Sequence, residues 1–227
     1  MTDVSDRIRV WDLPTRVFHM ALALTVIGSI ASAKIGGNAM VWHIRLGLLA
    51  MALLVFRLVW GFVGGYWCRF ATFLYRPAAI ADYLRGGRGP GGHYAVGHSP
   101  LGALSVFALL GVLALQVATG LVADDEVATT GPLNRFVSSA VALKATAWHE
   151  TGGQWSVLLL IAAHVGAVFY YQHRKRIDLI RPMLDGDKPG LPPSTRASAD
   201  GTRERLLALS LALAAAGAAW WVGRLGG

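Results

Sequence analysis

The fold of this chain is decided by residues 147–171, AWHETGGQWSVLLLIAAHVGAVFYY. A helix that crosses a bilayer needs about 20 mostly apolar residues, and this stretch provides them. It also contains two histidines, His149 and His164, fifteen residues apart. An ionisable side chain is costly in the hydrocarbon core of a membrane, so it usually belongs to a functional site. The stretch therefore predicts a membrane helix that carries two functional histidines.

The composition of the whole chain indicates a membrane protein with several spans. Of the 227 residues, 54% are hydrophobic and only 15% are charged, whereas soluble domains contain about 25% charged residues. Lys and Arg outnumber Asp and Glu by 21 to 13, but they bracket apolar segments, which is typical of membrane topology rather than of nucleic-acid binding. The single cysteine, Cys68, excludes an internal disulfide, covalent haem attachment and a cysteine-ligated iron–sulfur cluster.

Five segments are long and apolar enough to be membrane helices. We expect them at residues 17–33, 41–63, 101–123, 147–171 and 206–222. The first segment follows Arg7, Arg9 and Arg16 and ends in Ala31-Ser32-Ala33, so it also imitates a secretory signal peptide. We expect it to be retained as a membrane helix. The chain is thus predicted to be an all-α integral membrane protein.

The distribution of basic residues between the loops predicts the orientation. Lys and Arg are concentrated before the first span, between the second and third, and between the fourth and fifth. On the other side, Lys34, Arg135 and Lys144 are offset by the acidic run at 124–126. The positive-inside rule then makes the N-terminus cytoplasmic and, with five spans, the C-terminus periplasmic. We expect a multi-pass protein of the bacterial inner membrane.

Two further histidines, His19 and His43, lie near the starts of the first two spans, which run in opposite directions. Depth decides which histidines meet. With a rise of 1.5 Å per residue, His149 and His164 are separated by about 22 Å along their helix and by about 60° around it. His43 then matches His149 near the outer face. His19 matches His164 toward the inner face, about one helical turn shallower, a mismatch that helix tilt absorbs.

Paired histidines at two depths favour two haems. Each histidine alone has a structural alternative, which is a hydrogen bond across a helix interface. A structural zinc site needs four ligands that converge at one point, unlike these. Neutral imidazole is a standard axial ligand of haem iron, and two such ligands leave no open position for oxygen chemistry. We therefore predict two haems, ligated by His43 with His149 and by His19 with His164, and an electron-transfer function.

Short motifs surround these histidines in a specific order and spacing. They are VWDLPTRVFH at 10–19, WHIRLG at 42–47, FRLVWG at 56–61, GHSPLG at 97–102, WHE at 148–150 and AHV at 163–165. Through them the chain resembles the bacterial di-haem b-type cytochromes of the cytochrome b-561 and nickel–iron hydrogenase cytochrome b subunit family. The resemblance implies a four-helix transmembrane bundle with two non-covalent b-type haems. It also implies the same four axial ligands.

The extent of the resemblance divides the chain into three parts. We expect a di-haem cytochrome b domain at residues 9–183, a basic cytoplasmic linker at 184–205 and a C-terminal transmembrane helix at 206–222. This last helix lies outside the core resemblance. It either completes the bundle or packs on a partner helix through its small residues.

Two arginines and a fifth histidine are further candidates. Arg45 and Arg57 lie near the predicted haem levels, where a guanidinium can clamp a haem propionate. The alternative for both is interfacial snorkelling. His98, in an inner loop, either caps that loop or serves a quinone site, a proton path or a haem propionate.

The resemblance implies an electron-transfer subunit of a respiratory complex, and we expect no catalytic residues in the chain itself. It would relay electrons between a periplasmic redox protein, such as a c-type cytochrome or a hydrogenase, and the membrane quinone pool. We expect the partner to dock on the outer loop at 124–146. The chain contains no Gly-rich nucleotide fingerprint, so NADH is not the expected donor. Two alternatives stay open: a stand-alone quinone-linked oxidoreductase acting on a small periplasmic substrate such as superoxide, and a haem-free transporter or anchor.

Overall fold

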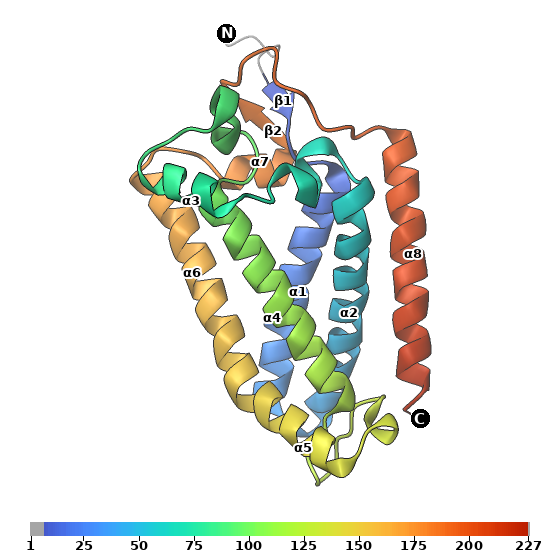
Figure 1. Ribbon diagram of the computed structural model, residues 1–227. Coiled ribbons are helices and arrows are strands. Elements are labelled where there is room, and N and C mark those ends of the chain that lie inside the picture. The colour runs from blue at the N-terminus through green and yellow to red at the C-terminus, as the bar shows by residue number, and fades with distance from the viewer. Residues whose placement is uncertain (1–6, 227) are drawn as a thin grey trace. The chain divides into compact units, whose positions relative to one another are not determined.

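A computed structural model describes residues 7–226 of the chain (Figure 1). Within this range, five long helices are apolar enough to cross a membrane. They are α1 (Leu13–Ile35), α2 (Met40–Val63), α4 (Pro100–Val122), α6 (Gln154–His173) and α8 (Thr202–Arg224). The chain is an all-α integral membrane protein, as its sequence predicts.

The fourth span differs from its expected form. Helix α5 (Ser139–Ala147) occupies part of the expected outer loop and leads through a π-helical segment, η7 (Trp148–Gly153), into α6. Two glycines permit the wider turn, because a Cβ atom at Gly152 would lie 2.9 Å from the Trp148 ring and one at Gly153 would overlap the Gln116 side chain. π-Helical segments inside α-helices are frequent at functional sites. His149 lies in this segment.

Short elements join the long helices. The α-helical ones are α3 (Pro77–Leu84) and α7 (Ile180–Asp185). The 3₁₀ turns are η2 (Gly37–Ala39), η3 (Tyr66–Cys68), η4 (Phe70–Thr72), η5 (Pro90–Ala95) and η6 (Asn134–Phe136).

Residues 184–205, expected as a basic linker, are partly ordered by contacts with residues near the N-terminus. Strand β1 (Arg7–Arg9) pairs antiparallel with β2 (Asp187–Pro189), with Arg9 opposite Asp187. The Arg9 guanidinium donates hydrogen bonds of 2.6 Å to Asp187 and of 2.6 Å to Asp200. These contacts anchor part of the segment 184–205 to the N-terminal strand. Helix α8 then begins at Thr202, four residues before the expected span.

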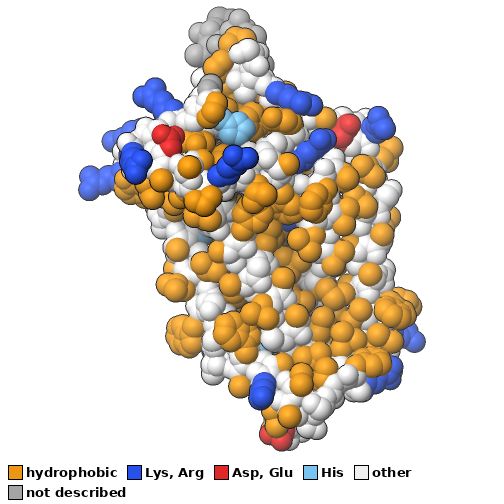
Figure 2. All heavy atoms as spheres, in the orientation of Figure 1, with side chains coloured by type: hydrophobic (Ala, Val, Ile, Leu, Met, Phe, Trp, Pro, Cys, Tyr) orange, Lys and Arg blue, Asp and Glu red, His pale blue; other side chains and the backbone are white. Residues whose placement is uncertain are grey.

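The chain forms two compact units, each assembled from three stretches. Unit 1 comprises residues 1–17, 57–107 and 163–209, and unit 2 comprises 18–56, 108–162 and 210–227. The boundary falls inside each of the five long helices. Unit 1 contains 16 of the 21 Lys and Arg residues. On the face shown in Figure 2, hydrophobic side chains cover the long helices, and most Lys and Arg side chains lie at the connecting segments.

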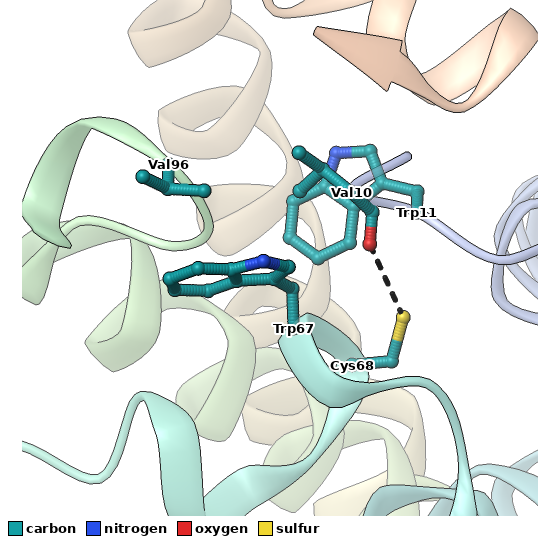
Figure 3. Packing of buried hydrophobic residues seen from close by; sticks show 5 residues of the cluster. All are labelled: Val10, Trp11, Trp67, Cys68 and Val96. Atoms are coloured by element: carbon teal, nitrogen blue, oxygen red, sulfur yellow. Dashed lines mark hydrogen bonds between the residues drawn. The ribbon is translucent and has the colours of Figure 1, made fainter. Parts of the chain in front are cut away.

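The core of unit 1 is a cluster of Val10, Trp11, Trp67, Cys68 and Val96 (Figure 3). The Cys68 thiol is fully buried and points at the carbonyl oxygen of Val10, with a sulfur–oxygen distance of 4.0 Å. Burial raises the pKa of this thiol to about 12. Cys68 is therefore a packing residue, since a reactive cysteine needs a thiolate.

The Trp-Asp-Leu-Pro motif at the start of α1 has a structural role. Asp12 is fully buried, and its Oδ1 accepts a 2.9 Å hydrogen bond from the Thr15 backbone N–H, which is an N-cap. Its Oδ2 accepts hydrogen bonds from Trp60 Nε1 at 3.0 Å and from the Gly65 N–H at 2.7 Å. One carboxylate thus caps α1 and holds the end of α2.

The core of unit 2 contains one buried residue from each of three helices: Leu54 of α2, Leu113 of α4 and Val157 of α6. Leu22 and Val26 of α1 pack against them. This core positions the four helices around the site described next.

Candidate functional site

A cavity of about 510 Å³ lies inside unit 2. Helices α1, α2, α4 and α6, the π-helical segment η7 and the loop after α4 contribute its lining, which is mostly apolar. His43 of α2 and His149 of η7 both line it. A largely apolar cavity of this volume with a few polar groups is typical of a cofactor site.

The two histidines face each other closely. Their ring centroids are 5.8 Å apart, and the ring planes are nearly perpendicular, at 84°. Metal–imidazole bonds are about 2 Å long, so two imidazoles on opposite sides of one ion have ring centres about 6 Å apart. The centroid spacing of His43 and His149 therefore leaves room for a single metal ion between the rings, and a haem held there would occupy the largely apolar cavity that both residues line.

Backbone carbonyls fix the tautomer of both rings. His43 Nδ1 lies 2.9 Å from the carbonyl oxygen of Ser29, and His149 Nδ1 lies 2.9 Å from that of Gln116. Because a carbonyl can only accept, each Nδ1 carries the proton and donates it. Each Nε2 is then left with its lone pair for a metal. Ligating histidines characteristically donate their second ring N–H in this way.

Gln116 holds His149 from two directions. Its carbonyl oxygen accepts from the His149 ring, and its side-chain Nε2 donates a 2.8 Å hydrogen bond to the His149 carbonyl oxygen. Gly120, one turn further along α4, makes room for the ring, because a Cβ there would lie 2.8 Å from His149 Cε1. The orientation of this imidazole is therefore set mainly by α4.

Gly47 leaves open space beside the other ring. It lines the cavity one helical turn after His43, and a Cβ built on it would meet no atom within 4 Å. Glycine inside a helix costs about 1 kcal/mol relative to alanine. The open space at this position leaves room for a bound group in the cavity.

Three charged side chains line the cavity: Lys34, Asp125 and Glu150. Lys34 Nζ donates a 3.3 Å hydrogen bond to Oε1 of Gln154. Asp125 accepts hydrogen bonds from the backbone N–H groups of residues 127, 128 and 129, which lower its pKa to about 2. Lys34 is the only Lys or Arg among the described residues of the lining, so it is the cation available to a propionate there.

The other two predicted ligands are not brought into this cavity. His19 lies on α1 in unit 2, and His164 lies on α6 in unit 1. Both side chains are half-buried. The structure describes each within its own unit, so the inner pair stays a prediction.

The two predicted arginines differ in their surroundings. Arg45 is exposed, does not line the cavity, and places its guanidinium 5.1 Å from the centre of the Trp42 ring. Arg57 is 3% exposed, donates a 3.1 Å hydrogen bond from Nη2 to the Cys68 carbonyl oxygen and lies over the Phe70 ring. Its buried Nη1 has no hydrogen-bond partner in the described part of the chain.

His98 belongs to the aromatic packing of unit 1. Its ring lies between those of Trp11, at 4.7 Å, and Phe73, at 4.4 Å between centroids. Its carbonyl oxygen accepts a 2.8 Å hydrogen bond from the Tyr75 hydroxyl. These contacts make His98 part of the packing of unit 1, and its role stays a prediction.

Comparison with known proteins gives the family. Residues 10–186 match the family model described as prokaryotic cytochrome b561. The chain belongs to the prokaryotic cytochrome b561 family. No curated protein and no solved structure matches it. Family membership makes this chain a membrane cytochrome b that binds b-type haem and takes part in electron transport. Among residues 7–226, no three His, Cys, Asp or Glu side chains are grouped as a metal site, and a bis-histidine haem requires none.

Sequence reasoning missed several residues that shape the cavity. They are Ser29, Lys34, Gly47, Gln116 and Gly120. A usable signal existed for one of them, since a glycine four residues after a histidine in an apolar helix indicates a close approach on that face. The two carbonyl acceptors carried no signal, because every residue has a carbonyl.

Proposed function

We propose that this cytochrome transfers electrons across the bacterial inner membrane through two b-type haems, each held by two histidines. His43 and His149 hold one haem, and His19 and His164 hold the other. The observation that carries the proposal is the His43–His149 pair, with its 5.8 Å centroid separation and both Nδ1 atoms bonded to backbone carbonyls. A bound haem supplies a one-electron iron couple.

The protein's own groups orient the ligands and control access. The carbonyls of Ser29 and Gln116 hold the two Nε2 atoms in the ligating tautomer. Two imidazoles on one iron would leave no open coordination position, and small molecules would then be kept from the metal. The apolar lining excludes water, and Lys34 supplies a positive charge toward a haem propionate. Together, the paired histidines, the apolar lining and Lys34 favour electron transfer over bond-making chemistry at the iron.

Of the two arginines expected at propionates, Arg57 has the stronger support. A buried guanidinium is costly unless it is paired, and its Nη1 has no hydrogen-bond partner among the described residues. Arg45 is exposed and contacts Trp42 instead. We therefore assign Arg57 to a haem propionate and leave Arg45 as an interfacial residue.

The distribution of charges supports an orientation of the protein in the membrane. With most of the basic residues in unit 1, the positive-inside rule makes its loops cytoplasmic and the segment 124–146 periplasmic. The His43–His149 haem then exchanges electrons with a periplasmic redox protein, a c-type cytochrome or a hydrogenase-like protein. The inner haem exchanges them with membrane quinone.

A stand-alone reaction with superoxide is the second candidate, and the cavity disfavours it. Asp125 and Glu150 line the cavity together with a single lysine. Asp125 is ionised at neutral pH, and backbone hydrogen bonds lower its pKa further, to about 2. A small anion is repelled by such a surface, whereas a basic redox protein is attracted to it.

The experiment that tests the proposal is the haem content of the purified chain. A reduced-minus-oxidised spectrum with pyridine haemochrome quantification should give a b-type band and two haems per chain. A ratio near one would contradict the two-haem path. The absence of a b-type band would contradict haem binding itself.

A further inference from the structure

Unit 1 contains a second hollow, of about 260 Å³, which the electron path does not use. It is formed by the turn at η3, by the loop of η5 and by the segment 192–196 that precedes α8. Its lining includes the polar side chains of His93, Ser194, Thr195 and Arg196. No Asp or Glu of the described residues lines it. The hollow is therefore electropositive and lined by hydrogen-bond donors.

Arg196 is held in place by stacking, and its guanidinium donates no hydrogen bond to the described residues. Its guanidinium carbon lies 4.4 Å from the centre of the Tyr66 ring, and its carbonyl oxygen accepts a 2.6 Å hydrogen bond from Trp67 Nε1. Within residues 7–226 no carboxylate pairs with it. Stacking on an aromatic ring uses the face of the guanidinium and leaves the N–H groups along its edge available. Such an edge binds a doubly oxygenated anion in bidentate fashion.

The neighbouring hydroxyls are available as well. The backbone turn is fixed by a 2.8 Å hydrogen bond from the Thr195 N–H to the Pro192 carbonyl oxygen. The side-chain oxygens of Ser194 and Thr195 form no hydrogen bond within the described part of the chain. The His93 ring, packed 4.9 Å from the Trp67 ring and bonded to the Thr72 carbonyl oxygen, forms one wall. A guanidinium edge beside two hydroxyls is the donor set that proteins use for phosphate.

We propose that this hollow is a binding site for a phosphate group. The chemistry is shared by two sources, the headgroup of an anionic phospholipid and a soluble phosphate ester. A quinone headgroup is neutral and needs no unpaired guanidinium, so the charge of the site favours phosphate. The site does not depend on the haems, and its test is independent of the electron-transfer proposal.

The test compares three variants with the wild-type protein. R196Q removes the guanidinium, and S194A/T195V removes both hydroxyls without changing the charge. R203Q is the matched control, because Arg203 is an exposed arginine of unit 1 that does not line the hollow. Equal haem content of all four proteins shows that they are folded.

Two probes distinguish the sources. Phosphatidylglycerol retained from mixed phosphatidylglycerol–phosphatidylcholine nanodiscs is counted by native mass spectrometry. Labelled inorganic phosphate binding is measured in detergent, at constant ionic strength set by chloride. We expect R196Q to weaken binding of at least one probe by about tenfold or more, because it loses a charge-assisted hydrogen-bond pair. We expect a smaller loss for S194A/T195V and none for R203Q.

The results separate the possibilities as follows. Retention of phosphatidylglycerol alone identifies a lipid headgroup site, and binding of inorganic phosphate identifies a site for soluble phosphates. Equal losses in R196Q and R203Q, with none in S194A/T195V, would show diffuse attraction and overturn the proposal. Failure of the wild-type protein to bind either probe would overturn the proposal too. So would displacement of a bound probe by a neutral quinone analogue alone.

Discussion

His43 and His149 face each other across one cavity, with ring centroids 5.8 Å apart and ring planes at 84°. Each ring is bonded through Nδ1 to a backbone carbonyl of a different helix, that of Ser29 on α1 or that of Gln116 on α4. Three helices and the π-helical segment therefore hold the two imidazoles at one cavity. A structural hydrogen-bonding histidine would need no second imidazole at this distance.

The open space at Gly47 predicts a site-specific block. Gly47→Phe fills the cavity next to His43, so we expect the variant to lose one of the two haems. Gly111→Phe is the matched control, because a Cβ at Gly111 also meets no atom within 4 Å but Gly111 does not line the cavity. Haem content per chain, measured by pyridine haemochrome, checks both variants. Equal haem loss in the two would contradict a haem face at Gly47.

Lys34 should raise the reduction potential of the haem in this cavity. A nearby cation stabilises the form with the additional electron, so Lys34→Gln should lower the midpoint potential by some tens of millivolts, on the order of the Coulomb energy at about 10 Å in a partly solvated site. Potentiometric titration of the haem band measures this shift. Arg45→Gln removes a cation that does not line the cavity. A larger shift in Arg45→Gln than in Lys34→Gln would contradict the assignment.

Substitution of Asp12 should lower the stability of the folded protein. Asp12→Asn keeps an oxygen for the Thr15 N–H but places an NH₂ group against Trp60 Nε1 and the Gly65 N–H. Buried unsatisfied groups cost about 1–3 kcal/mol each, so this variant should unfold at a lower temperature by about as much as Asp12→Ala. Asp178→Asn is the control, since Asp178 is exposed and its single capping oxygen is retained by Asn. Thermal unfolding followed by circular dichroism in detergent checks all three. A neutral effect of Asp12→Asn would contradict the role assigned to Oδ2.

Asp125 predicts a pH dependence confined to acid conditions. Its pKa is lowered to about 2 by backbone hydrogen bonds, from an ordinary value of about 3.9. The stabilisation of the folded protein by ionised Asp125 is therefore fully present above about pH 4 and is lost as the pH falls through about 2. The difference in melting temperature between wild type and Asp125→Asn should stay constant from pH 7 to 5 and shrink below pH 4. An unchanged difference at pH 2.5 would contradict a contribution from ionisation.

The spans and the family were accessible from the sequence. Apolar runs of bilayer length predicted all five helices, because membrane helices satisfy every backbone group internally and so follow length and hydropathy. The order of motifs such as WHIRLG at 42–47 predicted the cytochrome family, which the family match confirms. The depth argument paired His43 with His149 as ligands of one haem, and both residues line one cavity.

The details of the site could not be predicted from the sequence. Which carbonyl meets His149 depends on how α4 is rotated, and the sequence contains no mark of that rotation. The π-helical segment rests on contacts of Gly152 and Gly153 with side chains that only the folded chain brings together. The sequence predicted that Lys34 lies in a loop after the first span. In the structure α1 extends past it to Ile35, and Lys34 lines the cavity.

The most direct test of the account is the haem content of the double variant His43→Ala/His149→Ala. If the two residues ligate one iron, each single variant and the double variant lose the same haem, and all three retain about one haem per chain. If they ligate different haems, each single variant also retains about one, but the double variant retains none. Haem quantification of these three proteins, with a folded helical spectrum for each, decides the matter. One retained haem in the double variant is the predicted result, and none would contradict the pairing.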